Sequence, residues 1–359
     1  MLARVRSALK SNATNEVWKH MKIEQLTKTA RDMVAPGKGI LAADESFPTI
    51  EKRFTKIGIK STEENRRAYR EMLFTAKGAG DYISGVILFD ETLRQGLKGG
   101  KPFAKVLRDQ GIIPGIKVDT GAKALAGFPG EKITEGLDGL RDRLTEYYQL
   151  GARFTKWRAV ITIGNGIPTR FCIDANAHAL ARYAALSQEA GLVPIVEPEV
   201  LMDGDHTIER CADVTETALK SLYFHLHAHR VVLEGTLLKP NMVLSGKDCR
   251  KQADVTEVAT ATVRTLSRCV PAVVPGIVFL SGGQSAQEAT EHLNAMNAMG
   301  THPWELSFSY GRALQAPALD AWGGKTQNFA AGQKAFFHRA RLNGAARSGS
   351  YTSRMEQAA

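Results

Sequence analysis

The sequence has 359 residues and a formal net charge of +10, and it has no apolar run long enough to cross a lipid bilayer. Its basic residues are spread along the chain, which argues against a dedicated nucleic-acid-binding arm and fits either an anionic substrate or a basic surface. The four cysteines, Cys172, Cys211, Cys249 and Cys269, form no CxxC pair, so we predict neither a zinc knuckle nor a redox motif. We interpret them as reduced thiols of an intracellular protein.

The two ends of the chain differ in composition from the rest. The first residues, MLARVRSALKSNATN, are basic and lack any acid, a composition shared with organellar transit peptides. We favour a loose N-terminal arm over residues 1–25 and a cytoplasmic protein. Residues 26–343 are predicted to form a single domain, because no linker rich in Pro, Gly or Ser divides them. The small, polar segment 344–359 is predicted to be a mobile C-terminal tail.

Short apolar or β-branched runs return at intervals of about 30–45 residues, each followed by a helical pattern, which is the spacing of strand–helix units. The eight runs are GKGILAAD, YISGVILFD, IIPGIKVD, RFTKWRAV, GLVPIVEPEV, VVLEGTLLKP, AVVPGIVFLSGG and WELSFSYGR. Capping boxes at Ser61 with Glu64 and at Ser285 with Glu288 predict two helix starts. The pattern predicts an α/β protein of the (β/α)8 (TIM) barrel class. The alternative, a doubly wound open sheet, usually carries a glycine fingerprint after its first strand, and AADESFPT is not one.

Charged side chains gather at the C-terminal ends of these predicted strands. They include Asp44, Asp90, Lys117, Asp119, Lys156, Arg158, Glu197, Glu199 and Lys239. Residues two apart on a strand share a face, and in a barrel that face is the interior, whose C-terminal end carries catalytic residues. Burying an unpaired charge costs several kcal/mol. We therefore interpret the group as a functional cluster rather than as separate structural ion pairs.

Lys239, at the end of the apolar run VVLEGTLLKP, is the candidate nucleophile. A lysine attacks a carbonyl only as the neutral amine, and both an apolar environment and a nearby cation such as Lys156 favour that form. The amine would form a Schiff base with a ketone or aldehyde, and the protonated imine would draw electrons from the neighbouring bond. Glu197 is the candidate proton shuttle, and Asp44 is the candidate base for a hydroxyl proton as a carbon–carbon bond breaks.

The loops after the seventh and eighth predicted strands carry an anion-binding pattern. FLSGGQSAQE places two glycines and a serine before a capped helix, where free backbone amides and the helix dipole favour an anion. SYGRAL adds a glycine turn and Arg312, and these two loops form the usual phosphate site of a barrel. We predict a bound phosphate there, with Lys117 as the candidate for a second anion.

The motifs together resemble the metal-independent, Schiff-base (class I) fructose-bisphosphate aldolases of glycolysis and gluconeogenesis. LEGTLLKPNM, IVEPE, KWR, GIKVD, FLSGGQS and FSYGRALQ occur in the family's order, and the resemblance runs from MVAPGKGILAADES to HRARLNG. It implies a carbon–carbon lyase that cleaves fructose 1,6-bisphosphate reversibly to dihydroxyacetone phosphate and glyceraldehyde 3-phosphate, with no metal ion or other cofactor. It also implies a homotetramer and, for some members, actin or another cytoskeletal partner.

The resemblance implies a role for each matching residue. Lys239 would be the Schiff-base lysine and Glu197 the general acid/base, with Glu199 supporting the lysine. Asp44 would handle the C4 hydroxyl proton, and Lys156, which is also implied as catalytic, would lie beside the substrate. The substrate would also contact Arg158. The residues implied for the C1-phosphate are Ser281, Gly282, Gly283, Ser309, Gly311 and Arg312. Those implied for the C6-phosphate are Lys117, Ser46, Thr49 and Arg53.

Two features depart from the family pattern. Phe47-Pro48 follows ADES where the family often has Thr-Gly, which stiffens the segment and removes a hydroxyl next to the C6-phosphate residues. Many eukaryotic members end in a tyrosine that folds over the site, whereas this chain ends in MEQAA and its last tyrosine is Tyr351.

HLHAH, with His225, His227 and His229, has the spacing of a metal site, because helix positions four apart share a face. It precedes the sixth predicted strand and so lies at the N-terminal end of the barrel, and we interpret it as a surface or interface cluster. A metal-dependent barrel enzyme is thus a weaker hypothesis. Two further hypotheses are a different Schiff-base barrel aldolase, such as a transaldolase, and a scaffold that binds actin or a polyanion.

Overall fold

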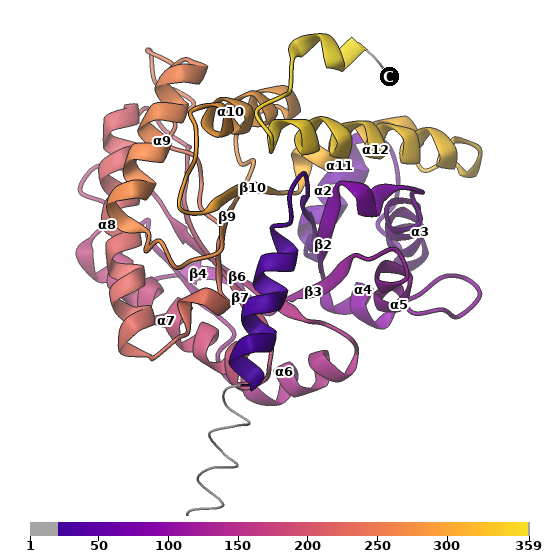
Figure 1. Ribbon diagram of the computed structural model, residues 1–359, viewed down its shortest axis with the longest axis horizontal. Helices are drawn as coiled ribbons and strands as arrows, with labels where there is room; N and C mark the ends of the chain where they lie inside the picture. Colours follow the sequence, from indigo (N-terminus) through magenta and orange to yellow (C-terminus); the bar gives the residue numbers. More distant parts are fainter. Residues whose placement is uncertain (1–20, 358–359) are drawn as a thin grey trace, which may run out of the picture.

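Eight parallel strands form a closed barrel in the computed structural model, which describes residues 21–357 (Figure 1). The strands are β1 (Gly39–Ala43), β2 (Ile83–Leu88), β3 (Ile113–Lys117), β6 (Phe154–Ile161), β7 (Val193–Val200), β8 (Leu237–Leu238), β9 (Gly276–Phe279) and β10 (Glu305–Tyr310). Their order around the barrel is β1-β10-β9-β8-β7-β6-β3-β2. Each predicted run contains most or all of one strand, and the predicted (β/α)8 barrel is confirmed.

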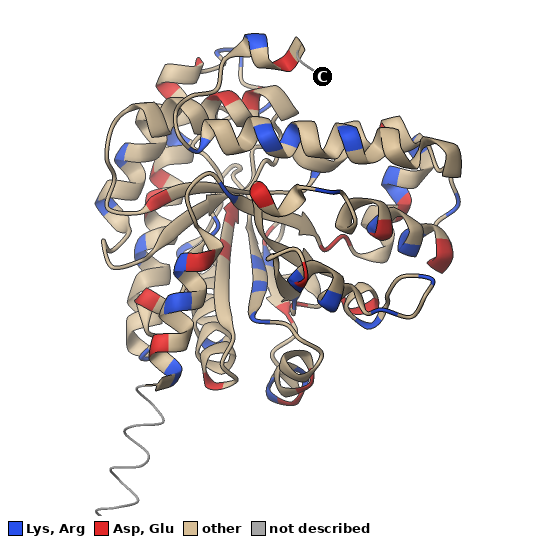
Figure 2. Cartoon of the chain, turned by 45° about the vertical axis from the view of Figure 1, so that its right-hand side comes forward, with Lys and Arg blue, Asp and Glu red and all other residues tan. Residues whose placement is uncertain are grey.

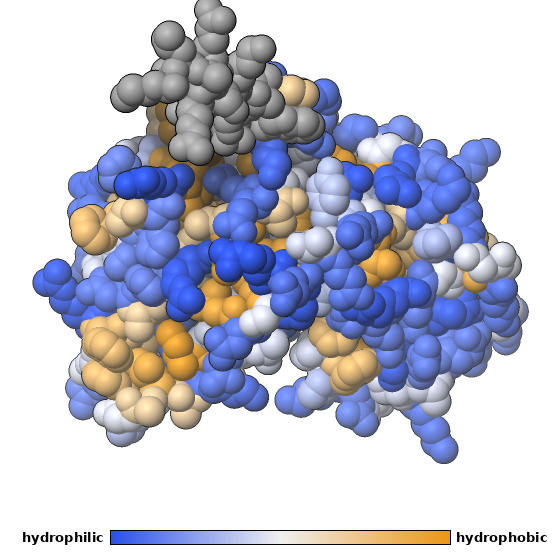
Figure 3. Space-filling model, turned by 90° about the horizontal axis from the view of Figure 1, so that it is seen from below, coloured by the Kyte–Doolittle hydropathy of each residue, from blue (hydrophilic) through white to orange (hydrophobic). Residues whose placement is uncertain are grey.

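An outer layer of helices surrounds the strands (Figure 1). The helices are α2 (Phe47–Lys56), α3 (Glu63–Phe74), α4 (Asp90–Arg94), α5 (Phe103–Arg108), α6 (Leu140–Gln149), α7 (Arg170–Glu189), α8 (Ile208–Ala228), α9 (Val255–Cys269), α10 (Ala286–Ala298), α11 (Arg312–Trp322) and α12 (Phe329–Ala346). None of the helices within residues 21–357 combines the length and the apolar character that a membrane span requires. The face of the molecule seen in Figure 3 is mainly hydrophilic, with smaller apolar areas between the polar ones.

One of the two predicted capping boxes is present. Ser285 accepts a hydrogen bond from the Glu288 amide, and the Glu288 carboxylate accepts one from the Ser285 amide, at the start of α10. The predicted box at Ser61 and Glu64 is wrong, because α3 begins one residue later. Thr62 is its N-cap and accepts from the Asn65 amide.

Two local features differ from the predicted elements. The run VVLEGTLLKP forms a 3-10 turn over Leu233–Gly235 and only a two-residue strand, β8. Its apolar residues are mostly buried, so the apolar run reflects burial and does not indicate the length of the strand. A short antiparallel hairpin, β4 (Gly121–Ala124) with β5 (Lys132–Glu135), follows β3 and has no apolar run of its own that would predict it.

A helix over residues 21–33 closes the N-terminal end of the barrel. Its side chains Leu26, Ala30 and Met33 pack in one buried cluster with barrel-interior side chains, among them Phe154 and Ile195. The predicted loose arm is therefore wrong for residues 21–25, which belong to this helix, while residues 1–20 lie outside the described part of the chain. The helix seals one end of the barrel and leaves the other end for chemistry.

The barrel interior is layered by the two-residue period of its strands. In β6, Phe154 lies in the apolar bottom layer, and Lys156 and then Arg158 follow on the same face. In β7, Ile195 lies in that bottom layer and Glu197 follows it on the same face. Phe154 fills the bottom so closely that a β-carbon on Gly115 of β3 would clash with its ring. An apolar floor thus supports a charged upper layer.

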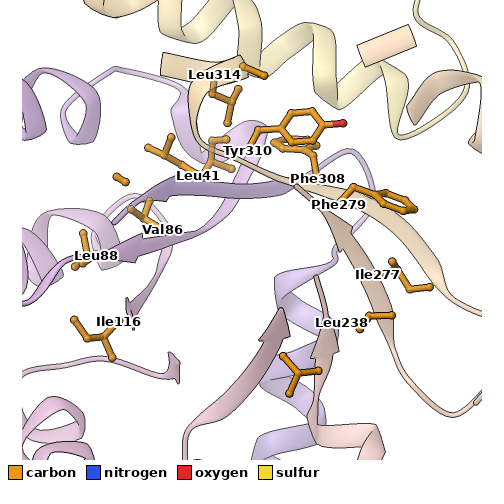
Figure 4. Packing of buried hydrophobic residues seen from close by; sticks show 14 of the residues in the cluster. Leu41, Val86, Leu88, Ile116, Leu238, Ile277, Phe279, Phe308, Tyr310 and Leu314 are labelled. Atoms are coloured by element: carbon orange, nitrogen blue, oxygen red, sulfur yellow. The ribbon is translucent and has the colours of Figure 1, made fainter. Parts of the chain in front are cut away.

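The outward-facing strand residues pack under the helices. Figure 4 shows Leu41, Val86, Leu238, Phe279 and Tyr310 in one buried cluster along the barrel strands, with Leu314 of α11 near Tyr310. These residues alternate with the interior ones along each strand, which is the pattern of a strand buried on both faces. The two-sided burial fixes the strand register and hence the height of each charged side chain in the barrel.

The C-terminal segment packs against the outer helices. Helix α12 continues to Ala346, into the segment predicted as a tail. Beyond it, the Tyr351 amide donates to Asn294 of α10, and the Tyr351 hydroxyl donates to Glu356 at 2.8 Å. Glu356 in turn pairs with Arg339 of α12 at 2.6 Å. The segment therefore has a defined docking site, and its mobility stays a prediction.

Candidate active site

A cavity of about 1180 Å³ opens at the C-terminal ends of the barrel strands. Figure 2 shows Lys, Arg, Asp and Glu residues on the barrel strands as well as on the outer helices. The cavity is lined by every residue predicted for the site except Gly283: Asp44, Ser46, Thr49, Arg53, Lys117, Lys156, Arg158, Glu197, Glu199, Lys239, Ser281, Gly282, Ser309, Gly311 and Arg312. The barrel brings these residues together from seven separate strand ends and the segments that follow them.

Lys156 lies at the centre of the charged layer. Its Nζ is 2.7 Å from Asp44 Oδ2 and 3.1 Å from Glu197 Oε2. The Lys156 and Glu197 side chains are almost fully buried, so these contacts are little screened by solvent. One ammonium group therefore holds two carboxylates from β7 and the end of β1 in fixed positions.

Lys239 directly follows β8 and shares the second oxygen of Glu197. Its Nζ is 3.2 Å from Glu197 Oε1, and its side chain is 4% exposed. The Lys239 amide donates to the Val196 carbonyl, which places the lysine beside β7 at the level of Glu197. Glu197 is thus within hydrogen-bond distance of the candidate nucleophile and is positioned to exchange protons with groups bonded to it.

The two carboxylates and Lys156 stabilise one another in their charged forms. Burial alone would raise the pKa of Asp44, but Lys156 and then Lys239 hold that pKa well below its ordinary value. The pKa of Glu197 is lowered against burial by the same two lysines. Burial would lower the pKa of Lys156, yet Asp44 and Glu197 raise it above its ordinary value. The site therefore contains ionised carboxylates that can accept protons.

Arg158 and Glu199 form the next layer toward the mouth. The Arg158 Nε donates to Glu199 Oε2, and the Arg158 amide donates to Asp119 Oδ2 at 3.2 Å. The hairpin strand β5 also holds the backbone of Arg158, because the Thr134 hydroxyl donates to the Arg158 carbonyl at 2.7 Å. A β-carbon on Gly282 would lie 3.1 Å from Glu199 Oε1, so Glu199 also contacts the glycine turn after β9.

That glycine turn joins β9 to α10. Ser281 and Gly282 line the cavity, whereas Gly283 does not. Gly283 instead has φ +79° and packs on Met202, where a β-carbon would lie 2.5 Å from the sulfur. Its role is to allow the turn rather than to face the cavity. The turn leads into the capped N-terminus of α10, which favours an anion.

The turn after β10 faces the same side of the cavity. Ser309 is buried at 1% exposure, and its hydroxyl has no hydrogen-bond partner within the described chain. Gly311 precedes the first residue of α11, Arg312. A free buried hydroxyl, a helix N-terminus and an arginine here provide donors suited to a phosphate.

The residues predicted for a second phosphate come from two elements. Ser46 is the N-cap of α2, and its hydroxyl lies 3.2 Å from that of Thr49. Pro48 occupies the first turn of α2, where no amide donor is needed, so Phe47-Pro48 starts a helix. Lys117 of β3 pairs with Asp119 at 2.6 Å.

Arg53 of α2 lies beside the turn after β10. A β-carbon on Gly311 would come within 3.7 Å of Arg53 Nη2. This geometry groups Arg53 with the residues predicted for the C1-phosphate, although its sequence position groups it with Ser46 and Thr49. The side chain of Arg53 crosses from α2 to the turn after β10, which sequence separation alone does not reveal.

Tyr351 does not line the cavity. Its side chain is 6% exposed and is enclosed by the C-terminal segment and the outer helices. Burial, together with the carboxylate of Glu356, raises the pKa of Tyr351. In the structure this tyrosine is an anchor of the segment rather than a group at the mouth of the barrel.

The histidine segment HLHAH ends helix α8, away from the cavity. The ring of His225 lies 5.6 Å from that of His178 on α7, and the ring of His229 lies 5.0 Å from it. No sequence motif points to His178 as part of this group. Within residues 21–357 no group of His, Cys, Asp or Glu has the arrangement of a metal site, and all four cysteines are free.

Sequence reasoning assigned no role to two supporting residues of the cavity, Glu45 and Asp119, although it placed Asp119 in the charged cluster at the strand ends. Glu45 lines the cavity and contacts Arg53, and Asp119 holds both Lys117 and the backbone of Arg158. Asp119 is recognisable as a strand-end charge, but its bridging position needs the pairing of β3 with β6. Glu45 follows β1 next to Asp44, and no sequence signal distinguishes it from a surface acid.

Comparison with known proteins agrees with this geometry. The family model described as fructose-bisphosphate aldolase class-I matches residues 25–359. A probable fructose-bisphosphate aldolase class 1 of Xanthomonas campestris pv. campestris is 63% identical over 92% of this chain and 99% of its own length. Cytosolic fructose-bisphosphate aldolase 4 of Arabidopsis thaliana is 56% identical over 91% of this chain and 84% of its own.

A solved structure also superposes closely. It is the fructose-bisphosphate aldolase of Plasmodium falciparum in complex with TRAP and a small-molecule inhibitor, with a TM-score of 0.92 and 51% identity. The match covers 92% of this chain and 96% of that one. The sequence, the barrel and the family match agree, and the chain belongs to the class I fructose-bisphosphate aldolase family of carbon–carbon lyases.

Proposed function

We propose that Lys239 carries out the aldolase reaction by forming a Schiff base with the ketose. The substrate would be fructose 1,6-bisphosphate, cleaved reversibly to dihydroxyacetone phosphate and glyceraldehyde 3-phosphate in glycolysis and gluconeogenesis. The observation that carries this proposal is that buried Lys239 and Lys156 share the carboxylate of Glu197 at the base of the cavity. Groups suited to phosphate lie above them on the strand ends.

Schiff-base formation begins with attack of the neutral Lys239 amine on the C2 ketone, which gives a carbinolamine. Glu197, 3.2 Å from the Lys239 nitrogen, first takes a proton from the Lys239 ammonium to free this amine, and after the attack it gives that proton to the C2 hydroxyl of the carbinolamine, which leaves as water. The product is a protonated imine on Lys239. Lys156 neutralises part of the charge of the Glu197 carboxylate before the first of these transfers and after the last.

Carbon–carbon cleavage then uses Asp44. Its carboxylate takes the proton of the C4 hydroxyl, the C3–C4 bond breaks, and the bonding electrons move into the imine to form an enamine. The C4 oxygen becomes the carbonyl of glyceraldehyde 3-phosphate. Protonation of the enamine at C3, followed by hydrolysis of the imine, releases dihydroxyacetone phosphate and restores Lys239.

The phosphates fix the substrate across the cavity mouth. We propose that the turns after β9 and β10 hold the C1-phosphate, through Ser281, Gly282, Ser309, Gly311 and Arg312. Lys117, Ser46 and Thr49 would hold the C6-phosphate. Arg158, which is tied to Glu199, would contact the sugar between them. Two fixed anions orient C2 toward Lys239 and the C4 hydroxyl toward Asp44.

Borohydride reduction in the presence of dihydroxyacetone phosphate tests the mechanism. Reduction should lock the imine as a stable secondary amine on Lys239, which peptide mass mapping locates. The Lys239→Met variant, with a matched Lys98→Met variant at an exposed position, separates specific from random labelling. An adduct on another lysine, or no adduct, contradicts the mechanism. Activity that EDTA abolishes would favour a metal-dependent enzyme instead.

We propose further that the chain forms a homotetramer. Phe224 on α8 is 69% exposed and Phe171 on α7 is 54% exposed, which is unusual for large apolar side chains. Phe224 lines a cavity of about 730 Å³ on the outer face of α7 and α8, together with Arg170, Arg210 and Lys220. A neighbouring subunit would remove this apolar surface from water.

Location and further partners follow from the relatives. A cytoplasmic location is proposed because the Arabidopsis relative is named as cytosolic. The Plasmodium aldolase was solved in complex with TRAP, so a protein partner for this chain is also proposed, with actin or another cytoskeletal protein as the candidate. The net charge of +10 is compatible with an acidic partner or a polyanion.

A further inference from the structure

Glu45 is a buried carboxylate between two arginines, directly after Asp44. Its Oε1 accepts from Arg53 Nη1 at 2.5 Å, and its Oε2 accepts from Arg70 Nη2 at 2.5 Å. The side chains of Glu45 and Arg70 are almost fully buried. The mechanism above uses neither of them, although Glu45 lines the cavity.

Contacts from the surrounding helices fix this carboxylate in place. Gln315 of α11 donates to Glu45 Oε1 at 2.7 Å and to the Ala42 carbonyl at 2.6 Å from the same amide nitrogen. The Gln315 carbonyl oxygen accepts from the Tyr69 hydroxyl at 3.0 Å. The Glu45 carboxylate is therefore bonded to side chains of α2, α3 and α11, and Gln315 links it to the β1 backbone.

The anchored carboxylate orients Arg53 toward the phosphate turn. A guanidinium is a rigid fork, so fixing Nη1 also fixes the direction of Nη2. Arg53 Nη2 is the atom that lies beside Gly311, at the N-terminus of α11. The same helix supplies Gln315, so one element carries both the anion-binding turn and the support of the arginine directed at it.

Charge supports the same conclusion. Two arginines share one carboxylate, so the group carries a net positive charge, and Arg70 Nε and Nη1 have no hydrogen-bond partner within the described chain. A buried ion triad of this kind is weak evidence for stability, because apolar residues of similar volume often do as well. Its position behind a phosphate turn favours a role in binding.

We propose that Glu45 is a positioning residue that acts through Arg53 to set the affinity for the phosphate held at the turn after β10. This inference rests on the proposed function, and it adds a residue that determines substrate affinity without touching the substrate. Glu45 would then govern KM and the affinity for inorganic phosphate, while the chemistry at Lys239 proceeds as before.

The test is a double-mutant cycle of Glu45→Gln and Arg53→Ala. The glutamine amide would face an arginine N–H, so one arginine loses its acceptor. We expect KM for fructose 1,6-bisphosphate and Ki for inorganic phosphate to rise about tenfold in Glu45→Gln, with kcat within about twofold. In the Arg53→Ala background, Glu45→Gln should raise KM and Ki by less than about twofold, because the arginine through which Glu45 acts is absent. An unchanged KM in Glu45→Gln, or fully additive effects, overturns the inference.

Two controls keep the result interpretable. Wild-type cleavage and the borohydride adduct are measured first, so a failure of the proposed function appears in the wild type and a failure of this inference only in the variants. If Glu45→Gln does not fold, Gln315→Met removes one donor to Glu45 and leaves both arginines paired. It should raise KM about threefold, and only when Arg53 is present. No rise, or an equal rise without Arg53, overturns the inference.

Discussion

At the scale of single residues, Lys156 decides the charge state of the site. It lies between Asp44 and Glu197, and the charges of the three groups outweigh the effect of burial on each pKa. Removing one partner of a buried ion pair leaves an uncompensated charge. The residues proposed for the chemistry therefore also stabilise the fold, and their charges make the free energy of unfolding depend on pH.

In the wild type, both carboxylates have a pKa below the unfolded values of about 3.9 and 4.3. Their contribution to stability is therefore present above those values and is lost only as the pH falls through the lower folded values. The wild type should hold its free energy of unfolding between about pH 8 and 5 as far as these groups are concerned.

The Lys156→Met variant reverses this dependence for Asp44. Burial is the largest single effect on the pKa of Asp44, and without the ammonium only Lys239 and Lys117 oppose it, so we expect that pKa to rise above its unfolded value and protonation to stabilise the fold. We expect the free energy of unfolding at pH 7 to fall by about 3–5 kcal/mol, and to recover as the pH is lowered toward 5. Urea unfolding across this range measures it, with the exposed Lys98→Met as control. Parallel pH curves for wild type and variant would contradict the argument.

At the scale of elements, the sequence predicts the repeated strands of the barrel but does not predict elements whose position depends on residues far along the chain. The eight apolar runs identify the barrel strands, and the alternation within them places Lys156 with Arg158 and Glu197 with Glu199. The helix over residues 21–33 escapes prediction, because the reason it is ordered is the open end of a barrel formed by residues far along the chain. The contact of Arg53 with the turn after β10 escapes it for the same reason.

The C-terminal segment is a second element whose position depends on distant contacts. The Tyr351 hydroxyl is paired with Glu356 and lies outside the cavity, so it should contribute stability and not catalysis. Tyr351→Phe should lower the free energy of unfolding by about 1–2 kcal/mol, because a part-buried hydrogen bond to a charged group is lost. The kcat for fructose 1,6-bisphosphate should be unchanged. Urea unfolding and steady-state kinetics measure the two effects, and a kcat reduced by about tenfold or more would place Tyr351 at the active site.

At the scale of the whole molecule, the proposed catalytic site and the proposed subunit interface occupy different faces. The catalytic cavity lies at the C-terminal ends of the strands, and its lining comes from one chain. The exposed aromatic side chain of Phe224 lies on α8, in the outer ring of helices. A single chain therefore contains the complete proposed site, and association should affect stability more than chemistry.

The Phe224→Glu variant separates association of the subunits from the chemistry at Lys239. We expect the wild type to sediment at about four times the chain mass of 39.1 kDa. A charge in place of Phe224 removes about 1.5–3 kcal/mol of apolar burial per copy and adds a desolvation penalty, so the variant should dissociate to smaller species. It should still form the Lys239 adduct, because the site is built within one chain. Val273→Glu is the matched control, since Val273 is 50% exposed but lies in the loop before β9. A wild-type monomer would contradict the tetramer, and a Phe224→Glu tetramer would place the interface elsewhere.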